Sequence, residues 1–221
     1  MKLKLVITAD GSHTVYVPVM NEHFHSVHGA ILESQHVFIE AGFNQFCGNK
    51  ISLLEIGFGT GLNTLLTLLE AKKSKMDVIY HSVEKYPLEK NILNGLNYVS
   101  ILGSGSEKKF KKIHDTSWNE EASVSDSFKL KKIQGDLITV ELTKKYDLIY
   151  FDAFSPEVQP EMWDKVNFQK IFNAMNPGGI LTTYSSKGSV RRTLAAIGFK
   201  VERIPGPPGK REMLRAWLPA N

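Results

Sequence analysis

A turn with glycine at every second position, in the segment EIGFGTGLN (Glu55–Asn63), constrains the fold of this chain more than any other feature. An apolar run, Ile51–Leu54, leads into it and a helix-like run, Leu62–Leu69, follows it. Glycine lets the backbone turn tightly and lets a ligand approach it closely. Where a strand turns into a helix, unpaired backbone N–H groups and the positive end of the helix dipole face the C-terminal edge of the strand. We therefore predict a ligand-binding turn rather than a purely structural one.

Strand and helix patterns alternate from residue 50 to the end of the chain. Strands are expected at 51–56, 77–83, 128–133, 146–152 and 180–184, and helices at 62–71, 88–98, 161–175 and 189–197, with a short helix after 136 and a helix stop at 176–179. Two last strands, at 200–204 and 213–218, suggest an antiparallel hairpin. This alternation predicts an α/β fold built on a doubly wound, mostly parallel sheet with an antiparallel edge.

The first 45 residues are expected to form an extension packed on a domain of residues 46–221. Residues 5–19 alternate around Asp10-Gly11, a dipeptide typical of β-hairpins, and a helix is expected at 29–41. Residues 100–127 are polar and rich in Ser and Lys, which predicts a short helix near Phe110 and a mobile loop.

Composition and spacing exclude several classes of protein. Cys47 is the only cysteine, so an internal disulfide is impossible, and no motif surrounds it. No window reaches the ~18 apolar residues of a membrane span. The N-terminus lacks a signal-peptide core, so the cytoplasm is the expected location. His23, His25 and His28 are spaced irregularly for a structural zinc site, and no metal is predicted.

The residues around the glycine turn narrow the choice of ligand. A Walker-type phosphate loop ends in Gly-Lys-Ser/Thr, whereas Gly61 is followed by Leu62 and Asn63. An acidic residue followed by G-x-G-x-G resembles motif I of class I methyltransferases, which bind S-adenosylmethionine. Glu84, at the end of the second expected strand, is placed to accept hydrogen bonds from ribose hydroxyls, although NAD-binding folds share this acid. Asp136 is placed to accept from an adenine amino group, to cap a helix, or to do both.

Asp152, at the end of the fourth expected strand, is a candidate for chemistry on an amine. Phe154 and Pro156 follow it and supply an aromatic ring and a rigid turn. Many amino-group methyltransferases carry an acid or Asn with Pro and an aromatic residue here. Methyl transfer needs a free amine lone pair, and a carboxylate can hold the amine, orient it and stabilise its developing charge. The aromatic ring can stack on a base that carries the amine.

Further motifs, taken in order along the chain, make the resemblance specific. They are 33–38 (ESQHVF), 55–63 (EIGFGTGLN), 82–87 (SVEKYP), 152–156 (DAFSP), 162–163 (MW), 177–179 (PGG), 190–192 (VRR), 198–199 (GF) and 209–213 (GKREM). From about Tyr16 to Met213 the chain resembles the methyltransferase module of the MnmC family. The resemblance implies the Rossmann-like class I S-adenosylmethionine-dependent methyltransferase fold with a small N-terminal β-hairpin extension.

The resemblance also implies an activity and a set of site residues. The family's module uses S-adenosyl-L-methionine to methylate the primary amine of 5-aminomethyl-(2-thio)uridine at the tRNA wobble position, giving 5-methylaminomethyl-(2-thio)uridine. It implies that Asp152 faces the amine, while Phe154 and Pro156 shape the pocket. The residues that it implies for cofactor binding are Glu33, Gln35, Glu55, Gly57, Gly59, Gly61, Asn63, Glu84, Lys85, Asp136 and Asp152.

Two-part members of this family also carry a C-terminal flavin-dependent oxidoreductase module that makes the aminomethyl group. This chain stops at Asn221, about where such a module would begin, and it has no second glycine-rich dinucleotide turn. It therefore resembles the stand-alone methyltransferase form, and a separate enzyme is expected to make the aminomethyl intermediate.

The net charge of +4 is compatible with an anionic partner, and the resemblance implies that this partner is tRNA. Basic residues near the expected strand ends and in the terminal hairpin are candidates for contacts with RNA phosphates: Lys187, Arg191, Arg192, Lys210 and Arg211. Simple solvation, or an interaction with the helix dipole, explains each of them equally well.

Three alternatives stay open at this point. An aminopropyltransferase of the spermidine-synthase type shares the fold, a strand-four acid and an amine nucleophile, but it normally has a diamine pocket rich in acids, and this chain shows one clear acid there. A methyltransferase for protein or small-molecule amines is the second alternative. A catalytically idle nucleic-acid-binding domain is the third, and the intact glycine turn and Asp152 argue against it.

Overall fold

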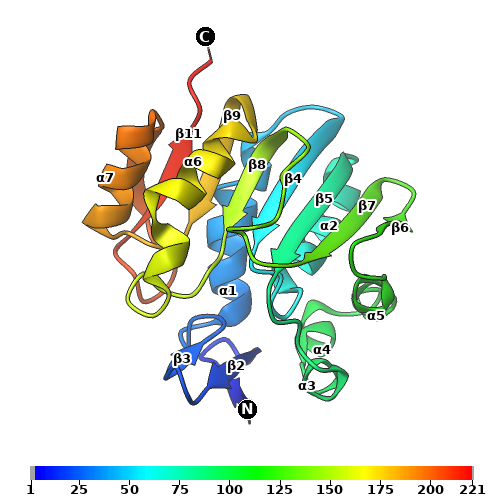
Figure 1. The fold of residues 1–221 in the computed structure, drawn as a ribbon. Helices are drawn as coiled ribbons and strands as arrows, with labels where there is room; N and C mark the ends of the chain where they lie inside the picture. Colours follow the sequence, from blue (N-terminus) through cyan, green and yellow to red (C-terminus); the bar gives the residue numbers. More distant parts are fainter. Residues whose placement is uncertain (1–2, 221) are drawn as a thin grey trace.

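An eight-stranded sheet crosses the computed structural model, which describes residues 3–220 (Figure 1). Its strand order is β10-β11-β9-β8-β4-β5-β7-β6. The central strands run parallel to one another: β9 (Met175–Thr183), β8 (Tyr146–Phe151), β4 (Lys50–Ile56), β5 (Asp77–Glu84) and β7 (Phe128–Gln134). Antiparallel strands complete the edges: β10 (Lys200–Pro205), β11 (Glu212–Trp217) and β6 (Glu121–Ser125). The predicted α/β sheet with an antiparallel edge is confirmed.

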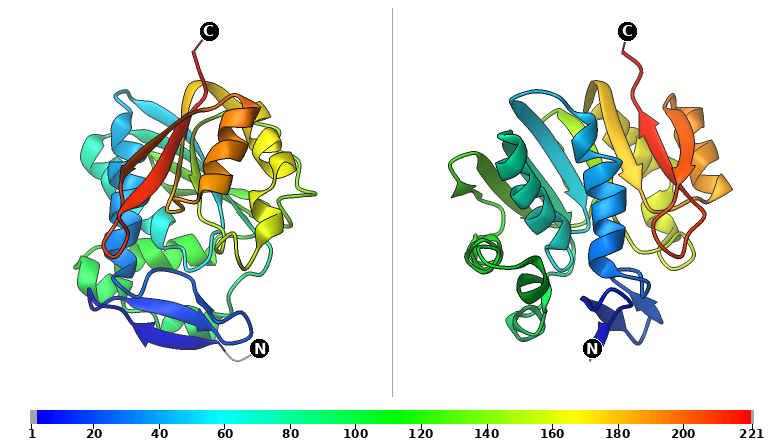
Figure 2. Two further views of the ribbon diagram at one scale, coloured as in Figure 1. Left: turned by 90° about the vertical axis from the view of Figure 1, so that its left-hand side faces the viewer. Right: turned by 180° about the vertical axis from the view of Figure 1, so that it is seen from behind.

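Helices cover both faces of this sheet, as a doubly wound fold requires (Figure 1 and Figure 2). On one face lie α6 (Lys165–Asn173) and α7 (Gly188–Ile197), whose Phe168 and Leu194 are fully buried against the strands. On the other face lie α2 (Leu62–Ser74) and a helix formed by α1 (Ala30–Ser34) and the π-helix η1 (Gln35–Glu40). Burial of the leucines of α2 on this face holds the helix that follows the glycine turn against the sheet.

Short helices complete the described chain: η2 (Phe43–Gln45), α3 (Lys90–Asn94), α4 (Tyr98–Leu102), α5 (Glu107–Asp115) and η3 (Pro160–Trp163). Within residues 3–220, the structure contains no helix with the length and apolar character that crossing a membrane requires.

The polar stretch 100–127 is more regular than its composition predicts. It contains α5 and β6, and β6 pairs antiparallel with β7 at the edge of the sheet. Val124 is the buried residue of β6. An edge strand of this kind lacks the apolar alternation by which strands are recognised in a sequence. The prediction of a loop after Phe110 is therefore wrong for residues 121–125.

Two predicted helices are interrupted in the structure. The helix expected at 88–98 is helical only in α3, which ends before Gly95, and α4 begins at Tyr98 and continues beyond the expected range. The helix expected at 161–175 starts as the 3-10 turn η3, continues as α6 and ends at Asn173. Residues 176–179, predicted as its stop, lie instead in β9, because Pro and Gly are tolerated where the register with β8 is irregular.

The N-terminal residues form a separate small sheet beyond the C-terminal ends of the parallel strands (Figure 1). β1 (Lys4–Ile7) and β2 (His13–Val17) make the predicted hairpin around Asp10-Gly11. A short third strand, β3 (Glu22–His23), which was not predicted, pairs with β2 in the described part of the chain. The division into an extension of residues 1–45 and a domain of residues 46–221 stays a prediction.

A buried histidine fastens this small sheet to the glycine turn. His25 is 8% exposed, and its Nε2 is hydrogen-bonded to the Thr60 hydroxyl at 3.0 Å. The Tyr98 hydroxyl donates to the same Thr60 oxygen at 3.2 Å. Burial lowers the pKa of His25 to about 4, so the folded protein requires the neutral imidazole.

We expect His25→Gln to reduce the loss of stability that acid causes. Above pH 6.5, His25 is neutral in both the folded and unfolded states. As the pH falls from 6.5 toward 4, only the unfolded state takes up the proton, which costs the wild type about 1.4 kcal/mol per pH unit relative to a neutral side chain. Urea unfolding at pH 7.5 and pH 5 measures the difference between the two proteins.

His23→Gln, at a half-exposed position in the same segment, is the control for the loss of one histidine. Equal pH dependence of the unfolding free energy in wild type and His25→Gln would contradict the role assigned to His25.

Candidate active site

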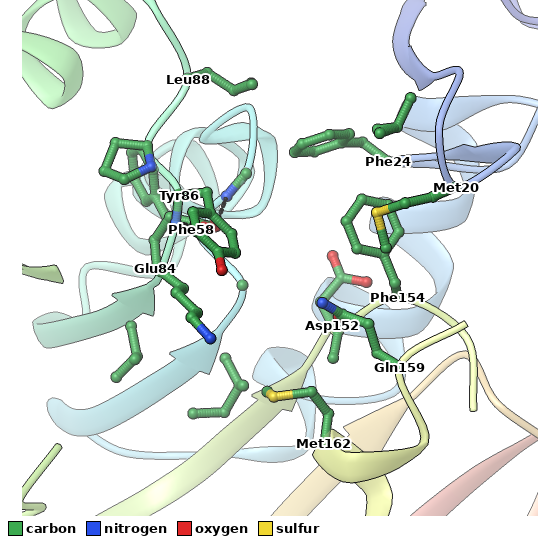
Figure 3. Close-up of a pocket in the computed structure, with 18 of the residues that line it drawn as sticks. Met20, Phe24, Phe58, Glu84, Tyr86, Leu88, Asp152, Phe154, Gln159 and Met162 are labelled. Carbon is green, nitrogen blue, oxygen red and sulfur yellow. Dashed lines mark hydrogen bonds between the residues drawn. The ribbon is translucent and has the colours of Figure 1, made fainter. Parts of the chain in front are cut away.

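A cavity of about 650 Å³ opens at the C-terminal edge of the parallel strands, beneath the N-terminal sheet (Figure 3). Residues at the ends of four adjacent strands line it: Gly57 after β4, Glu84 in β5, Asp136 after β7 and Asp152 after β8. Its volume is within the range of small-molecule sites, and this edge is where open α/β sheets bind ligands. The structure thus brings together four of the residues that the sequence singled out.

The glycine turn is pressed against the end of β8. Gly57, Gly59 and Gly61 all have positive φ, of 94°, 49° and 74°. A Cβ atom on Gly57 would lie 2.4 Å from the backbone oxygen of Asp152, so no larger residue fits there without a shift of the backbone. Gly57 and Gly59 line the cavity, whereas Gly61 is the N-cap of α2 and packs against His114.

Glu55 supports this turn from behind. It is fully buried and accepts hydrogen bonds from the Ser82 hydroxyl at 2.6 Å and the Thr64 hydroxyl at 3.3 Å. Burial raises the pKa of Glu55 to about 8, which leaves it mostly protonated at neutral pH. Glu55 therefore joins β4 to β5 and α2, and any effect that it has on a ligand passes through the turn.

Glu84 holds the turn from the side of the cavity. Its Oε2 accepts from the backbone N–H of Gly59 at 3.0 Å, and its Oε1 accepts from the N–H of Tyr86 at 2.8 Å. A carboxylate oxygen has a second lone pair, so both oxygens can still accept from a ligand.

Asp136 lines the same part of the cavity. Its Oδ2 is 2.8 Å from the Lys85 ammonium, and its Oδ1 accepts from the N–H of Ile138 at 2.9 Å. These two contacts hold the pKa of Asp136 below its usual range. The bond to Ile138 closes a turn, and no helix follows, so the short helix predicted after residue 136 is wrong.

Asp152 directs its carboxylate into the cavity (Figure 3). Its Oδ2 accepts from the Asn63 amide at 2.8 Å, and the described residues offer its Oδ1 no hydrogen bond. Protein surrounds the group closely enough that desolvation, with a further contribution from Glu33, raises the pKa of Asp152 to about 7. A carboxylate with such a pKa can take up and release a proton near neutral pH.

The part of the cavity beyond Asp152 is apolar and includes the N-terminal extension. Phe24 and Phe154 meet edge to face with ring centroids 5.2 Å apart, Met20 lies beside Phe154, and Met162 lines the cavity next to Gln159, on the other side of Asp152 (Figure 3). Of these aromatic and methionine residues, only Phe154 was predicted. Phe24 lies in a polar segment without periodicity, so nothing in the local sequence marks it.

Several predicted residues lie outside the cavity wall. Pro156 continues the loop after Phe154, and Gln35 begins η1. Glu33 is buried and pairs with Lys210. Asn63 reaches the site through its bond to Asp152.

The basic residues that were candidates for RNA contacts do not share one environment. Arg191, Arg192 and Arg211 are exposed. Lys187 forms an ion pair with Glu157, and Lys210 turns inward. Among residues 3–220 no group of three or more His, Cys, Asp or Glu side chains could hold a metal ion.

Comparison with known proteins gives matches over most of the chain. Residues 107–219, just over half of it, match the model of a family described as S-adenosyl-L-methionine-dependent methyltransferase. The chain is 31% identical over 204 residues to the tRNA 5-methylaminomethyl-2-thiouridine biosynthesis bifunctional protein MnmC of Leptospira interrogans, a match that covers 86% of this chain and 32% of that protein. The chain thus spans about a third of the length of this curated relative.

Solved structures show the same similarity. The crystal structure of MNMC2 from Aquifex aeolicus matches with a TM-score of 0.83 and 28% identity, covering 100% of this chain and 72% of that chain. Spermidine synthase from Thermotoga maritima matches with a TM-score of 0.58 and 11% identity, covering 94% of this chain and 68% of that chain, which shows a shared fold alone.

We expect Gly57→Ala to lower the free energy of unfolding by about 2 kcal/mol or more, because the new Cβ clashes with a backbone atom and the residue must keep a positive φ. Urea unfolding measures this loss. Gly48→Ala is the matched control, because a Cβ there meets no atom within 4 Å, and its effect should stay within about 1 kcal/mol. Equal stability of the two variants would show that the turn is not held against β8.

Proposed function

The chain belongs to the S-adenosyl-L-methionine-dependent methyltransferase family, and we propose that it methylates the primary amine of 5-aminomethyl-(2-thio)uridine at the wobble position of tRNA, giving 5-methylaminomethyl-(2-thio)uridine. The observation that carries the proposal is the carboxylate of Asp152, which faces a cavity between a glycine turn and an aromatic pocket. The name printed for the Leptospira relative supports the choice of substrate.

The cavity residues fit the family's cofactor. Gly57 and Gly59 line the cavity without a side chain, so a ligand can lie close to the backbone of the turn. Glu84 would accept hydrogen bonds from the ribose hydroxyls, and Asp136 from the adenine amino group. When bound, S-adenosyl-L-methionine supplies a methyl group on a positively charged sulfur, which an amine lone pair can attack.

Asp152 would prepare the amine for this attack. The Asn63 amide holds Oδ2 in place, which leaves Oδ1 for an N–H of the substrate. An ionised carboxylate orients the lone pair and stabilises the positive charge that develops on nitrogen. After transfer the nitrogen carries one proton too many, and Asp152 is placed to receive it because its pKa is about 7.

The apolar pocket beyond Asp152 suits a nucleobase. Sequence-specific RNA recognition commonly uses single-stranded bases that are turned out and stacked on aromatic rings. Phe24 and Phe154 offer such rings, and Met20 and Met162 complete a wall that excludes water from the reacting amine.

A tRNA substrate has further consequences for partners and location. The exposed Arg191 and Arg192 on α7 are candidates for contacts with phosphates. A separate activity would have to supply the aminomethyl group, and the reaction would take place where tRNA is found, in the cytoplasm.

An aminopropyltransferase activity is less well supported. A diamine carries two positive charges and needs acids at both ends of its pocket. Here the pocket beyond Asp152 is lined by aromatic and methionine side chains instead. The similarity to spermidine synthase extends to the fold alone.

Radiolabelled methyl transfer from S-adenosyl-L-methionine to tRNA from cells lacking this gene tests the proposal, with nucleosides identified by mass spectrometry. We expect label in 5-methylaminomethyl uridine. Label in another nucleoside would keep the methyltransferase and discard the substrate. Label in protein, or aminopropyl transfer to putrescine from the decarboxylated cofactor, would replace the proposal.

We expect Asp152→Asn to bind S-adenosyl-L-methionine normally by calorimetry and to lose about 10²- to 10⁴-fold in methyl transfer, because an amide cannot take up the proton. In the wild type, transfer should fall as the pH drops below about 7, where Asp152 becomes protonated. Glu161→Gln, at an exposed position after the same strand, is the control. Loss of cofactor affinity with transfer spared would refute the role of Asp152.

A further inference from the structure

Lys210 forms an ion pair that the proposed reaction has not used. It lies in the connection 206–211 between β10 and β11, and its Nζ is 2.9 Å from Oε1 of Glu33 in α1. The Lys210 side chain is 34% exposed, but that of Glu33 is only 8% exposed. The ammonium also lies 3.9 Å from the centroid of the Tyr184 ring. A cation that is partly buried against a carboxylate and an aromatic face is less screened than a surface pair.

The protein holds both partners of this pair in place. Oε2 of Glu33 accepts from the backbone N–H of Ser26 at 2.7 Å. Gly209, next to Lys210, packs so closely on His28 that a Cβ there would lie 2.2 Å from the imidazole. The 206–211 connection is thus fitted to the N-terminal segment, and Lys210 occupies a fixed position.

Tyr184 links this pair to the end of β8: Lys210 lies over its ring, and its hydroxyl donates to the backbone oxygen of Ala153, the residue after Asp152, at 2.8 Å. The negative charge of Glu33 raises the pKa of Asp152, and the positive charge of Lys210 lowers it. Neutral groups near Asp152 are the Asn63 amide, which donates to it, and the phenol of Tyr184, whereas the charged side chains of Glu84 and Lys85 line the same cavity.

Glu55 does not compete for the cation, because burial keeps it mostly protonated at neutral pH. Glu33 and Asp152 are therefore the two carboxylates that share the field of Lys210. Without the cation, two negative charges would face each other in a partly desolvated space, which favours retention of a proton on one of them.

We propose that Lys210 is a positioning residue that offsets the charge of Glu33 and so favours the ionised form of Asp152, which the substrate amine needs. The identity of that amine rests on the proposed function, whereas the effect of Lys210 on Asp152 belongs to the protein alone.

Four variants isolate this effect. Lys210→Met keeps the aliphatic stem but removes the charge, and should raise the pKa of Asp152 by about one unit or more. Lys210→Arg keeps the charge and should leave the pKa of Asp152 at its wild-type value. Glu33→Gln removes the neighbouring negative charge and should lower the pKa of Asp152. The double variant Lys210→Met/Glu33→Gln should return toward the wild type, because neither charge of the pair remains.

The measurement is a pH titration of the full chain with ¹³C-labelled aspartate carboxyl groups, followed by NMR without ligand. The signal of Asp152 is assigned by its loss in Asp152→Asn. Circular dichroism confirms that each variant is folded, and if Lys210→Met fails to fold, Glu33→Gln tests the same coupling from the other side. Arg211→Met removes one charge from the same connection and should leave the titration of Asp152 unchanged.

An unchanged Asp152 midpoint in Lys210→Met, or an unchanged midpoint in Glu33→Gln, would overturn the assignment. The pH dependence of the rate of methyl transfer to tRNA provides a second measurement. In Lys210→Met, the fall in rate on the acid side should move to higher pH. If the wild type transfers methyl groups to the tRNA but the midpoint does not move, the assignment of Lys210 alone fails. If the midpoint moves but no tRNA is labelled, the substrate proposal fails and the electrostatic role of Lys210 stands.

Discussion

The close contact between the glycine turn and the end of β8 is the constraint on which the site depends. Because Gly57 has no Cβ, the turn lies directly against the backbone of Asp152, and the Asp152 N–H also donates to the Ile56 oxygen at 2.9 Å. The backbone that would carry the cofactor and the carboxylate that would hold the amine therefore form one rigid unit. Transfer between two reactants depends on their distance and orientation, so this rigidity would favour the proposed reaction.

Desolvation is the second physical factor that shapes the site. It raises the pKa of Glu55 to about 8 and that of Asp152 to about 7, with different consequences. Glu55 has no access to the cavity and acts as a neutral support of the turn. Asp152 has such access, and nearby Lys210 counteracts part of the effect of burial. Two acids on adjoining strands thus acquire separate roles from their surroundings.

Both ends of the chain complete a site whose centre is built by the sheet. The N-terminal sheet supplies Met20 and Phe24, and the C-terminal hairpin supplies Lys210. Burial of His25 against Thr60 holds the first of these contributions in place, and the fit of Gly209 on His28 holds the second.

The sequence by itself determined the order of strands and helices, the glycine turn, and the placement of Glu84 and Asp152 at one edge of the sheet, because apolar periodicity and strand-to-helix turns are local properties. It did not identify β6, whose edge position leaves few buried side chains, or the interruption of two helices. Only the tertiary structure decided that Phe24 faces Phe154 and that Glu33 meets Lys210 across 177 positions. Such contacts depend on how separate elements pack, and no periodicity within either segment records them.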